Sequence, residues 1–152
     1  MSVGTNVKAP DFELVSNKNE KVRLSEQIKK GPVVLAFFPM AFTGVCTQEM
    51  CEFRDGLADF GKLNAQVYGI SVDSRFSLDA FAQQHNLDFP LLSDFNKEAA
   101  TAFDVLYEDF LGMRGVAKRS VFVIGTDGMV RYAWVSENAG VKPDLEPVKA
   151  AL

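Results

Sequence analysis

The sequence has few of the residues that build disulfide scaffolds or metal sites. Its 152 residues include two cysteines and one histidine. A small secreted scaffold needs several disulfides, and a structural zinc site needs about four nitrogen or sulfur ligands. We therefore expect no structural metal and no cofactor. In a reducing compartment, a pair of cysteines in one chain is typical of catalysis, redox exchange or metal binding. Metal binding is the least favoured of these, because the chain has too few cysteine and histidine ligands.

The chain also lacks a basic stripe and a long apolar run near its start. Lysine and arginine total 16 against 20 aspartate and glutamate, a formal charge of −4, and the charges are scattered. Nucleic acid is therefore not an expected partner. Lys8, Pro10, Asp11 and Glu13 interrupt the first 14 residues, which argues against a signal peptide or membrane span there. We expect a cytoplasmic protein without membrane association.

Apolar residues are plentiful enough for one core. The composition is 47% hydrophobic and 24% charged, within the usual range of a single globular domain. We expect one domain over residues 1–152, because no internal repeat, low-complexity tract or linker interrupts the chain. The chain stops soon after its last predicted helix begins, so we also expect that the natural protein can run a few residues further.

Patterns in the first half predict a hairpin, a buried strand and a long helix. Residues 11–14 and 21–24 read as two short strands joined by a polar turn. Residues 33–38 form a continuous apolar run between Pro32 and Pro39, which suits a central strand buried on both faces. Apolar residues at helical spacing then predict one amphipathic helix from Thr43 to about Phe60.

The second half alternates strands and helices. A buried strand at 66–72 is followed by Asp73 and Ser74, which supply capping chemistry for a helix at about 76–85. The further predicted elements are a strand at 90–92, a helix at 96–103, a loop at 107–116, a hairpin of strands 119–124 and 129–135, and a final helix after Pro143. Strands interleaved with helices, with hairpins at both ends, indicate an α/β sandwich with a mixed central sheet.

The segment with the most chemical information is residues 38–46, between the end of the buried strand and the first turn of the long helix. The carboxyl end of a strand is where α/β folds place their sites. A helix N-terminus carries partial positive charge and unpaired N–H groups, which favour a thiolate over a thiol. We therefore predict that Cys46 is nucleophilic at neutral pH.

Taken singly, the residues near Cys46 have simpler interpretations. A cysteine in a helix is often an inert small apolar residue, Thr43 could be only a helix cap, and Pro39 could only end a strand. Arg119 could be a solvated charge at a strand end. Their combination in one chain is what favours a redox site.

Pro39, Thr43 and Cys46 reproduce the pattern Pro-x-x-x-Thr-x-x-Cys, and Arg119 begins a predicted strand. In these features the chain resembles the peroxiredoxins, most closely the PrxQ branch, also called bacterioferritin comigratory proteins. The resemblance extends over nearly the whole chain, through residues 9–12, 71–73 and 89–94 to the last strand. It implies a thioredoxin-like fold with an N-terminal hairpin, and a thiol-dependent peroxidase that reduces hydrogen peroxide and organic hydroperoxides.

The resemblance also implies a role for each site residue. Pro39 would wall the peroxide pocket, while the Thr43 hydroxyl and the Cys46 backbone N–H would hold the peroxide oxygens. Arg119 would stabilise the thiolate and the charge that develops as the O–O bond breaks. Glu49, one turn after Cys46, is expected to hydrogen-bond within the site or to pair with Arg119. The residues expected to contact peroxide are Thr43, Val45, Cys46, Glu49 and Arg119.

The product would be a sulfenic acid on Cys46, which another thiol must resolve. The resemblance makes Cys51 the resolving cysteine and a thioredoxin-like protein the reductant. Residues five apart in an intact helix have Cα atoms about 8.5–9 Å apart, beyond the ~7 Å that a disulfide tolerates. We therefore predict that the helix unwinds over about residues 43–54 when the disulfide forms.

Alternatives remain at this point. Cys46 could serve a one-cysteine peroxidase that uses an outside thiol, or a peroxide-sensing switch or holdase-like protein whose partner affinity changes on oxidation. A thiol–disulfide oxidoreductase is less favoured, because the cysteines are spaced Cys-x4-Cys instead of Cys-x-x-Cys. Monomer and homodimer are both open. Phe42, beside Thr43, is predicted to be exposed at the rim of the site, where it would help to form a dimer face.

Overall fold

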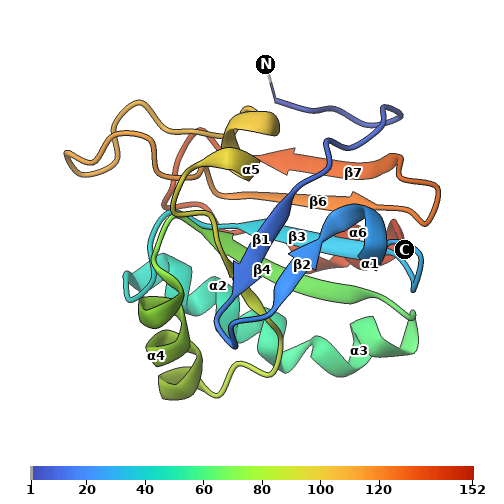
Figure 1. Ribbon diagram of the computed structural model, residues 1–152, viewed down its shortest axis with the longest axis horizontal. Helices are drawn as coiled ribbons and strands as arrows, with labels where there is room; N and C mark the ends of the chain where they lie inside the picture. Colours follow the sequence, from blue (N-terminus) through green and yellow to red (C-terminus); the bar gives the residue numbers. More distant parts are fainter. Residues whose placement is uncertain (1) are drawn as a thin grey trace.

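The structure, a computed structural model, describes residues 2–152; residue 1, the first of the predicted domain, lies outside the described residues. Seven strands of the described chain form a single mixed sheet in the order β2-β1-β5-β4-β3-β6-β7, with helices packed against it (Figure 1). The strands are β1 (Glu13–Ser16), β2 (Lys21–Arg23), β3 (Val33–Phe37), β4 (Gln66–Ser71), β5 (Leu91–Ser93), β6 (Ser120–Ile124) and β7 (Val130–Val135). The helices are α1 (Leu24–Gln27), α2 (Gly44–Asp55), α3 (Leu57–Lys62), α4 (Arg75–His85), α5 (Glu98–Ala102) and α6 (Leu145–Ala150).

The central strand β3 is buried along its whole length, as the apolar run predicts. It pairs in parallel with β4 and antiparallel with β6. Because successive side chains of a strand point to opposite faces, Leu35 and Phe37 join the apolar cluster that contains residues of α1 and α5. Ala36 and Phe38 join the cluster on the other face, which contains residues of α2, α3, α4 and α6.

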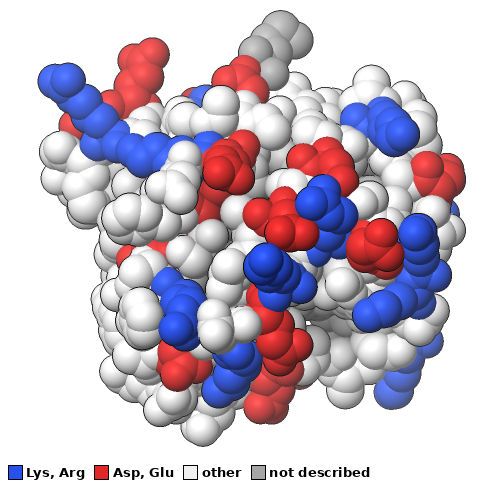
Figure 2. Space-filling model, in the orientation of Figure 1, with Lys and Arg blue, Asp and Glu red and all other residues white. Residues whose placement is uncertain are grey.

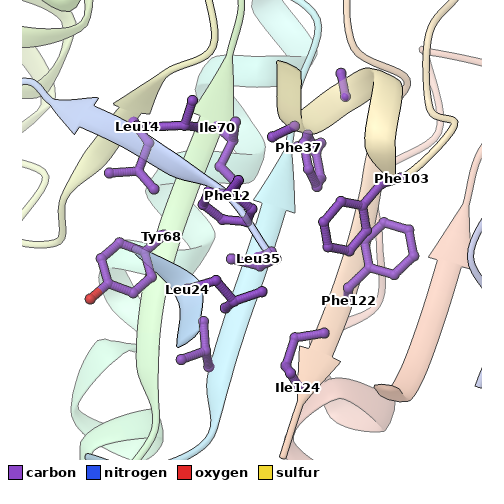
Figure 3. Packing of buried hydrophobic residues seen from close by; sticks show 14 of the residues in the cluster. Phe12, Leu14, Leu24, Leu35, Phe37, Tyr68, Ile70, Phe103, Phe122 and Ile124 are labelled. Carbon is purple, nitrogen blue, oxygen red and sulfur yellow. The ribbon is translucent and has the colours of Figure 1, made fainter. Parts of the chain in front are cut away.

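Aromatic rings fill much of the core on the α5 face (Figure 3). The ring of Phe103 packs against Phe37 and Phe122, with centroids 5.5 Å and 5.0 Å apart. Such tilted pairs add to the free energy gained from apolar burial. Since Phe37 ends β3, this packing holds the carboxyl end of the central strand, from which the chain runs toward Cys46.

The predicted fold class is confirmed, and most predicted elements are present. The N-terminal hairpin, the central strand, the strand at β4, the helix at α4 and the C-terminal hairpin all form where the patterns place them. Ser74 caps α4, its side chain accepting the backbone N–H of Ser77 at 3.2 Å. Residues 107–116 lie between α5 and β6 without a named helix or strand, as the loop prediction requires.

Several predicted boundaries are wrong. The first strand of the hairpin, expected at residues 11–14, is β1 at Glu13–Ser16, two residues later. The single helix expected from Thr43 to Phe60 is divided at Gly56, whose weak helix propensity lets the chain turn between α2 and α3. The second strand of the hairpin ends at Arg23, and a short helix, α1, begins at Leu24. Helix α5 starts at Glu98, later than expected, because Lys97 takes a left-handed backbone conformation with φ of 61°.

The surface carries charges of both signs. On the face drawn in Figure 2, lysine and arginine side chains are interspersed with aspartate and glutamate side chains, in agreement with the scattered charges of the sequence. No helix in residues 2–152 combines the length and the apolar character needed to cross a membrane.

Candidate active site around Cys46

Cys46 lies in the first turn of α2, with its side chain against the sheet. The helix begins at Gly44 after the Thr43 cap. Its buried face consists of Cys46, Glu49, Met50 and Phe53, the i, i+3, i+4, i+7 spacing of one helical stripe. Packing of Met50 and Phe53 into the core therefore also carries Cys46 and Glu49 into it, and both are fully buried.

Arg119 connects the two buried groups of α2. It directly precedes β6, and the register that places Ser120 opposite Phe37 brings it to the carboxyl end of β3. Its Nη2 donates to Cys46 Sγ at 3.1 Å, and its Nη1 donates to Glu49 Oε1 at 2.7 Å. Its Nε donates to the carbonyl of Ala139 at 2.8 Å. Because all three nitrogens of the planar guanidinium are engaged, its orientation toward the sulfur is fixed.

The backbone at Arg119 is held in turn by Tyr107 and Ser136. The Tyr107 hydroxyl donates to the Ser136 carbonyl at 2.9 Å and accepts the Arg119 backbone N–H at 3.4 Å. The Ser136 backbone N–H donates to the Arg119 carbonyl at 2.9 Å. The prediction that Tyr107 is only part of a loop is therefore incomplete. No local pattern points to its contacts, because its partners are 12 and 29 residues away.

Two acidic groups share the one guanidinium. Burial raises the pKa of Glu49 to about 7, even though Arg119 acts in the opposite direction. Burial alone would lower the pKa of Arg119, but Glu49 and Cys46 raise it on balance, so this side chain is a cation. The second carboxyl oxygen of Glu49, Oε2, is buried without a hydrogen-bond partner among the residues that the structure describes. The expected pairing of Glu49 with Arg119 is present.

Thr43 is the helix cap by position, but its side chain does not cap the helix. The Thr43 hydroxyl donates to the carbonyl of Met40 at 2.8 Å. Its oxygen therefore keeps lone pairs that can accept a further hydrogen bond. Val45, in the first turn of α2, is partly exposed, and Pro39 is buried just after β3. The structure thus brings Thr43, Val45 and Cys46 onto one turn of chain.

The loop between β3 and α2 is fastened to the loop after β4. Asp73 Oδ2 accepts the backbone N–H of Ala41 at 2.9 Å and the hydroxyl of Ser71 at 2.6 Å. Asp73 was expected only to supply capping chemistry for α4, so its contact with the site loop was not foreseen. Phe42 is half-exposed, as predicted, and has an unusual positive φ of 70°. Its ring packs edge-on against Phe81, with centroids 5.2 Å apart.

Cys51 lies in the same unbroken helix as Cys46, and both cysteines are free. Its side chain is partly exposed, whereas that of Cys46 is not. The helical spacing that underlies the unwinding prediction is therefore present in this reduced form. The prediction of a disulfide between the two remains a prediction.

The histidine contributes no metal ligand set. His85 ends α4, and its ring packs against Phe81 with centroids 5.1 Å apart. Within the described range 2–152, no group of three or more histidine, cysteine, aspartate or glutamate side chains is arranged to hold a metal ion.

A comparison with protein families matches residues 5–133 to a model described as the AhpC/TSA family. "Peroxiredoxin Bcp" of Bacillus subtilis is 36% identical over 140 residues, which cover 88% of this chain and 86% of that protein. "2-Cys peroxiredoxin BAS1, chloroplastic" of Spinacia oleracea is 38% identical over 155 residues, covering 95% of this chain. This chain spans 57% of the length of that relative.

The fold of this chain is also similar to the folds of solved structures. The crystal structure of "Peroxidoxin BcpB" from Mycobacterium tuberculosis has a TM-score of 0.85 and 38% identity, covering 98% of this chain and 94% of that one. The Xanthomonas campestris "Bacterioferritin Comigratory Protein", solved in connection with its alkyl peroxide reduction activity, has a TM-score of 0.82 and 29% identity. The alignment covers 97% of this chain and 96% of that one.

Proposed function

The chain belongs to the AhpC/TSA family, in the Bcp/PrxQ branch of the peroxiredoxins, and from that premise we propose that it is a thiol-dependent peroxidase whose nucleophile is Cys46. The observation that carries the proposal is the 3.1 Å contact between Arg119 Nη2 and Cys46 Sγ at the start of α2. A guanidinium and a helix N-terminus both favour a sulfur anion over a thiol. The Cys46 sulfur lies beside both of these groups.

The proposed reaction begins with attack of the Cys46 thiolate on one peroxide oxygen. The Sγ–O bond forms, the O–O bond breaks, and the leaving oxygen departs as hydroxide or alkoxide and takes up a proton. Charge moves from sulfur to that oxygen, so a fixed cation beside the sulfur stabilises the transition state. Arg119 is such a cation, since its other two donors hold it to Glu49 and to the Ala139 carbonyl.

Thr43 would orient the peroxide by accepting a hydrogen bond from its O–H. The Thr43 hydroxyl hydrogen is already donated to the Met40 carbonyl, so only its lone pairs face a new partner. This refines the role expected from the sequence, in which Thr43 simply holds a peroxide oxygen. Pro39 and Val45, on either side of Thr43, would exclude water from the reacting atoms.

Cys51 would resolve the sulfenic acid by forming a disulfide with Cys46 and releasing water. Its partial exposure is compatible with this role. The bond requires α2 to unwind, because both cysteines lie within one continuous helix. A thioredoxin-like reductant would then restore the thiols. A cytoplasmic location and a monomeric or dimeric state complete the proposal.

The proposed substrates are hydrogen peroxide and organic hydroperoxides. Alkyl peroxide reduction is ascribed to the similar Xanthomonas campestris protein, and this supports the second class. In either substrate, the attacked oxygen carries the hydrogen that Thr43 would accept, so the same geometry serves both.

Stopped-flow mixing of the reduced protein with hydrogen peroxide, followed by mass analysis, tests nucleophile and resolver together. We expect rapid oxidation of Cys46 and a product two mass units lighter with a Cys46–Cys51 link. Cys46→Ser should abolish the reaction. Slow oxidation of Cys46, no faster than that of an ordinary thiol, would overturn the proposal.

Cys51→Ser separates the resolving cysteine from the alternative of an outside thiol. We expect its first oxidation step to match the wild-type protein, while turnover with a thioredoxin system is lost. Unchanged turnover would remove Cys51 from the mechanism and leave a one-cysteine peroxidase.

A further inference from the structure

Glu49 is a buried ionisable group to which the proposed reaction assigns no chemical step. It lies one turn after Cys46, is fully buried, and binds the same guanidinium through Oε1. Its Oε2 has no hydrogen-bond partner within the described chain. A buried carboxylate with an unsatisfied oxygen is costly, whereas a protonated carboxyl carries no net charge.

Two cations and two acidic groups of the described chain act on Glu49 or share its partner. Arg119, the residue before β6, binds Glu49, and Cys46 lies on the same helix as Glu49 and binds the same guanidinium. Glu52, one turn further along α2, disfavours its charge, while Lys142, from the segment before α6, favours it weakly. Lys142 is itself paired with Glu52 at 2.7 Å. Among residues 2–152, only Arg119 is therefore available to balance Glu49 and Cys46, and both cannot be anions at low cost.

We propose, resting on the proposed peroxidase function, that Glu49 and Cys46 share one proton, which sits on Glu49 while the sulfur is a thiolate and leaves Glu49 when Cys46 is oxidised. Glu49 then acts on the reaction through Arg119, as a positioning residue. While the Glu49 carboxyl is neutral, the positive charge of Arg119 stabilises only the Cys46 thiolate. After oxidation the sulfur carries no charge, and the positive charge of Arg119 can stabilise an ionised Glu49 carboxylate.

The proton balance follows from this exchange. With Glu49 protonated, hydrogen peroxide, the Cys46 thiolate and the Cys51 thiol give the disulfide, two waters and the Glu49 carboxylate. Sulfur is oxidised, peroxide oxygen is reduced, and the proton lost by Glu49 equals the proton needed by the leaving oxygen. Unwinding of α2 would also expose Glu49 to water, which favours its ionised form. The protein would therefore complete the reaction without drawing a proton from solvent.

Proton uptake on oxidation tests the idea directly. Reduced protein in weak buffer at pH 6, below the pKa of about 7 that burial gives Glu49, is mixed with one equivalent of hydrogen peroxide, and a pH-indicator dye reports the protons taken up per disulfide formed. We expect about zero for the wild-type protein and about one for Glu49→Gln, in which the thiolate has no proton-bearing partner. Glu52→Gln is the matched control, because Glu52 also binds a cation at 2.7 Å on the same helix, and it should behave as wild type.

Equal proton uptake by the wild-type protein and Glu49→Gln would overturn the inference. Failure of the wild-type protein to form a disulfide would instead count against the proposed function, so the two failures are distinct. The infrared difference spectrum of unmodified protein gives a second readout that needs no variant. A protonated carboxyl band should disappear on oxidation and shift in heavy water, and its absence from the reduced protein would also overturn the inference.

Discussion

The carboxylate of Asp73 holds the backbone N–H of Ala41 at 2.9 Å, across 32 residues of sequence. The same oxygen accepts the Ser71 hydroxyl, so the end of β4 and the loop before α2 are joined at one point. This loop carries Pro39 and Thr43, and its shape decides where Thr43 stands relative to Cys46. The position of the site is therefore set by two adjacent parallel strands as well as by the helix.

Asp73→Ala should weaken both stability and reactivity. The variant leaves the Ala41 N–H without its partner, which costs about 1–3 kcal/mol of the free energy of unfolding. A loosened loop should also slow Cys46 oxidation by peroxide, measured by stopped flow. Asp127→Ala is a suitable control, because Asp127 makes the same kind of contact, to the Met129 N–H at 3.0 Å, in the hairpin between β6 and β7. If Asp73→Ala and Asp127→Ala oxidise equally fast, the anchoring role is refuted.

Thr43→Val should reduce the rate of Cys46 oxidation by about 10²-fold, the usual order for loss of one fixed hydrogen-bonding group at a reacting oxygen. Thr43→Ser keeps the hydroxyl and should retain most of the rate. Thr47→Val makes the same change one turn along α2, where the hydroxyl donates to the Thr43 carbonyl at 2.7 Å, and should have a smaller effect. A wild-type rate in Thr43→Val would remove its hydroxyl from the reaction.

The stability of the reduced protein should depend on pH through Glu49. Burial raises the pKa of Glu49 from 4.5 to about 7, so the folded protein binds this proton more tightly than the unfolded chain does. The stabilising contribution is complete below about pH 4.5 and is lost as pH rises through about 7. Relative to Glu49→Gln, the free energy of unfolding should fall by roughly 3 kcal/mol across this window.

Urea unfolding of the two proteins at several pH values measures this difference, and the effects of titrating groups that do not interact with Glu49 cancel in the comparison. Glu52→Gln should show no comparable trend against wild type, because Glu52 is partly exposed. A difference between wild type and Glu49→Gln that stays constant from pH 4.5 to 7.5 would mean that Glu49 has an ordinary pKa.

Oxidation should expose the backbone of α2. A disulfide between Cys46 and Cys51 cannot close within the continuous helix, so amide hydrogens over residues 44–55 should exchange much faster in the oxidised protein. Helix α4, which has its own Ser74 cap, serves as the internal reference and should keep its protection. Equal exchange of α2 in both redox states, with the disulfide formed, would exclude local unwinding.

The fold was largely predictable because its signals are local. The run at β3 is apolar on both faces, and the Thr126-Asp127-Gly128 turn specifies the hairpin of β6 and β7. The division between α2 and α3 was missed because Phe60 keeps the helical spacing beyond Gly56 and still packs on Phe53, with centroids 5.8 Å apart. The spacing describes the shared core face, which continues even where the helix does not.

The site was predictable in part. The motif around Cys46 and its resemblance to a family indicated Arg119, 73 residues away, although no local pattern links the two. Asp73 and Tyr107 could not be assigned in this way, because their contacts depend on how distant loops meet. Glu49 carried a usable signal, since it shares the i, i+3, i+4 stripe with Cys46 and Met50, and a charged residue on a buried stripe indicates a buried partner.

The pairing of Phe37 with Ser120 fixes where Arg119 meets Cys46. A slip of one residue between β3 and β6 would turn Arg119 to the opposite face of the sheet. During synthesis, Cys46 leaves the ribosome well before Arg119, so in an unfinished chain the Cys46 thiol lacks its arginine partner. Under the proposed function, fast oxidation of Cys46 by peroxide is expected only after these strands have aligned, so the rate of that reaction would be a measure of correct folding.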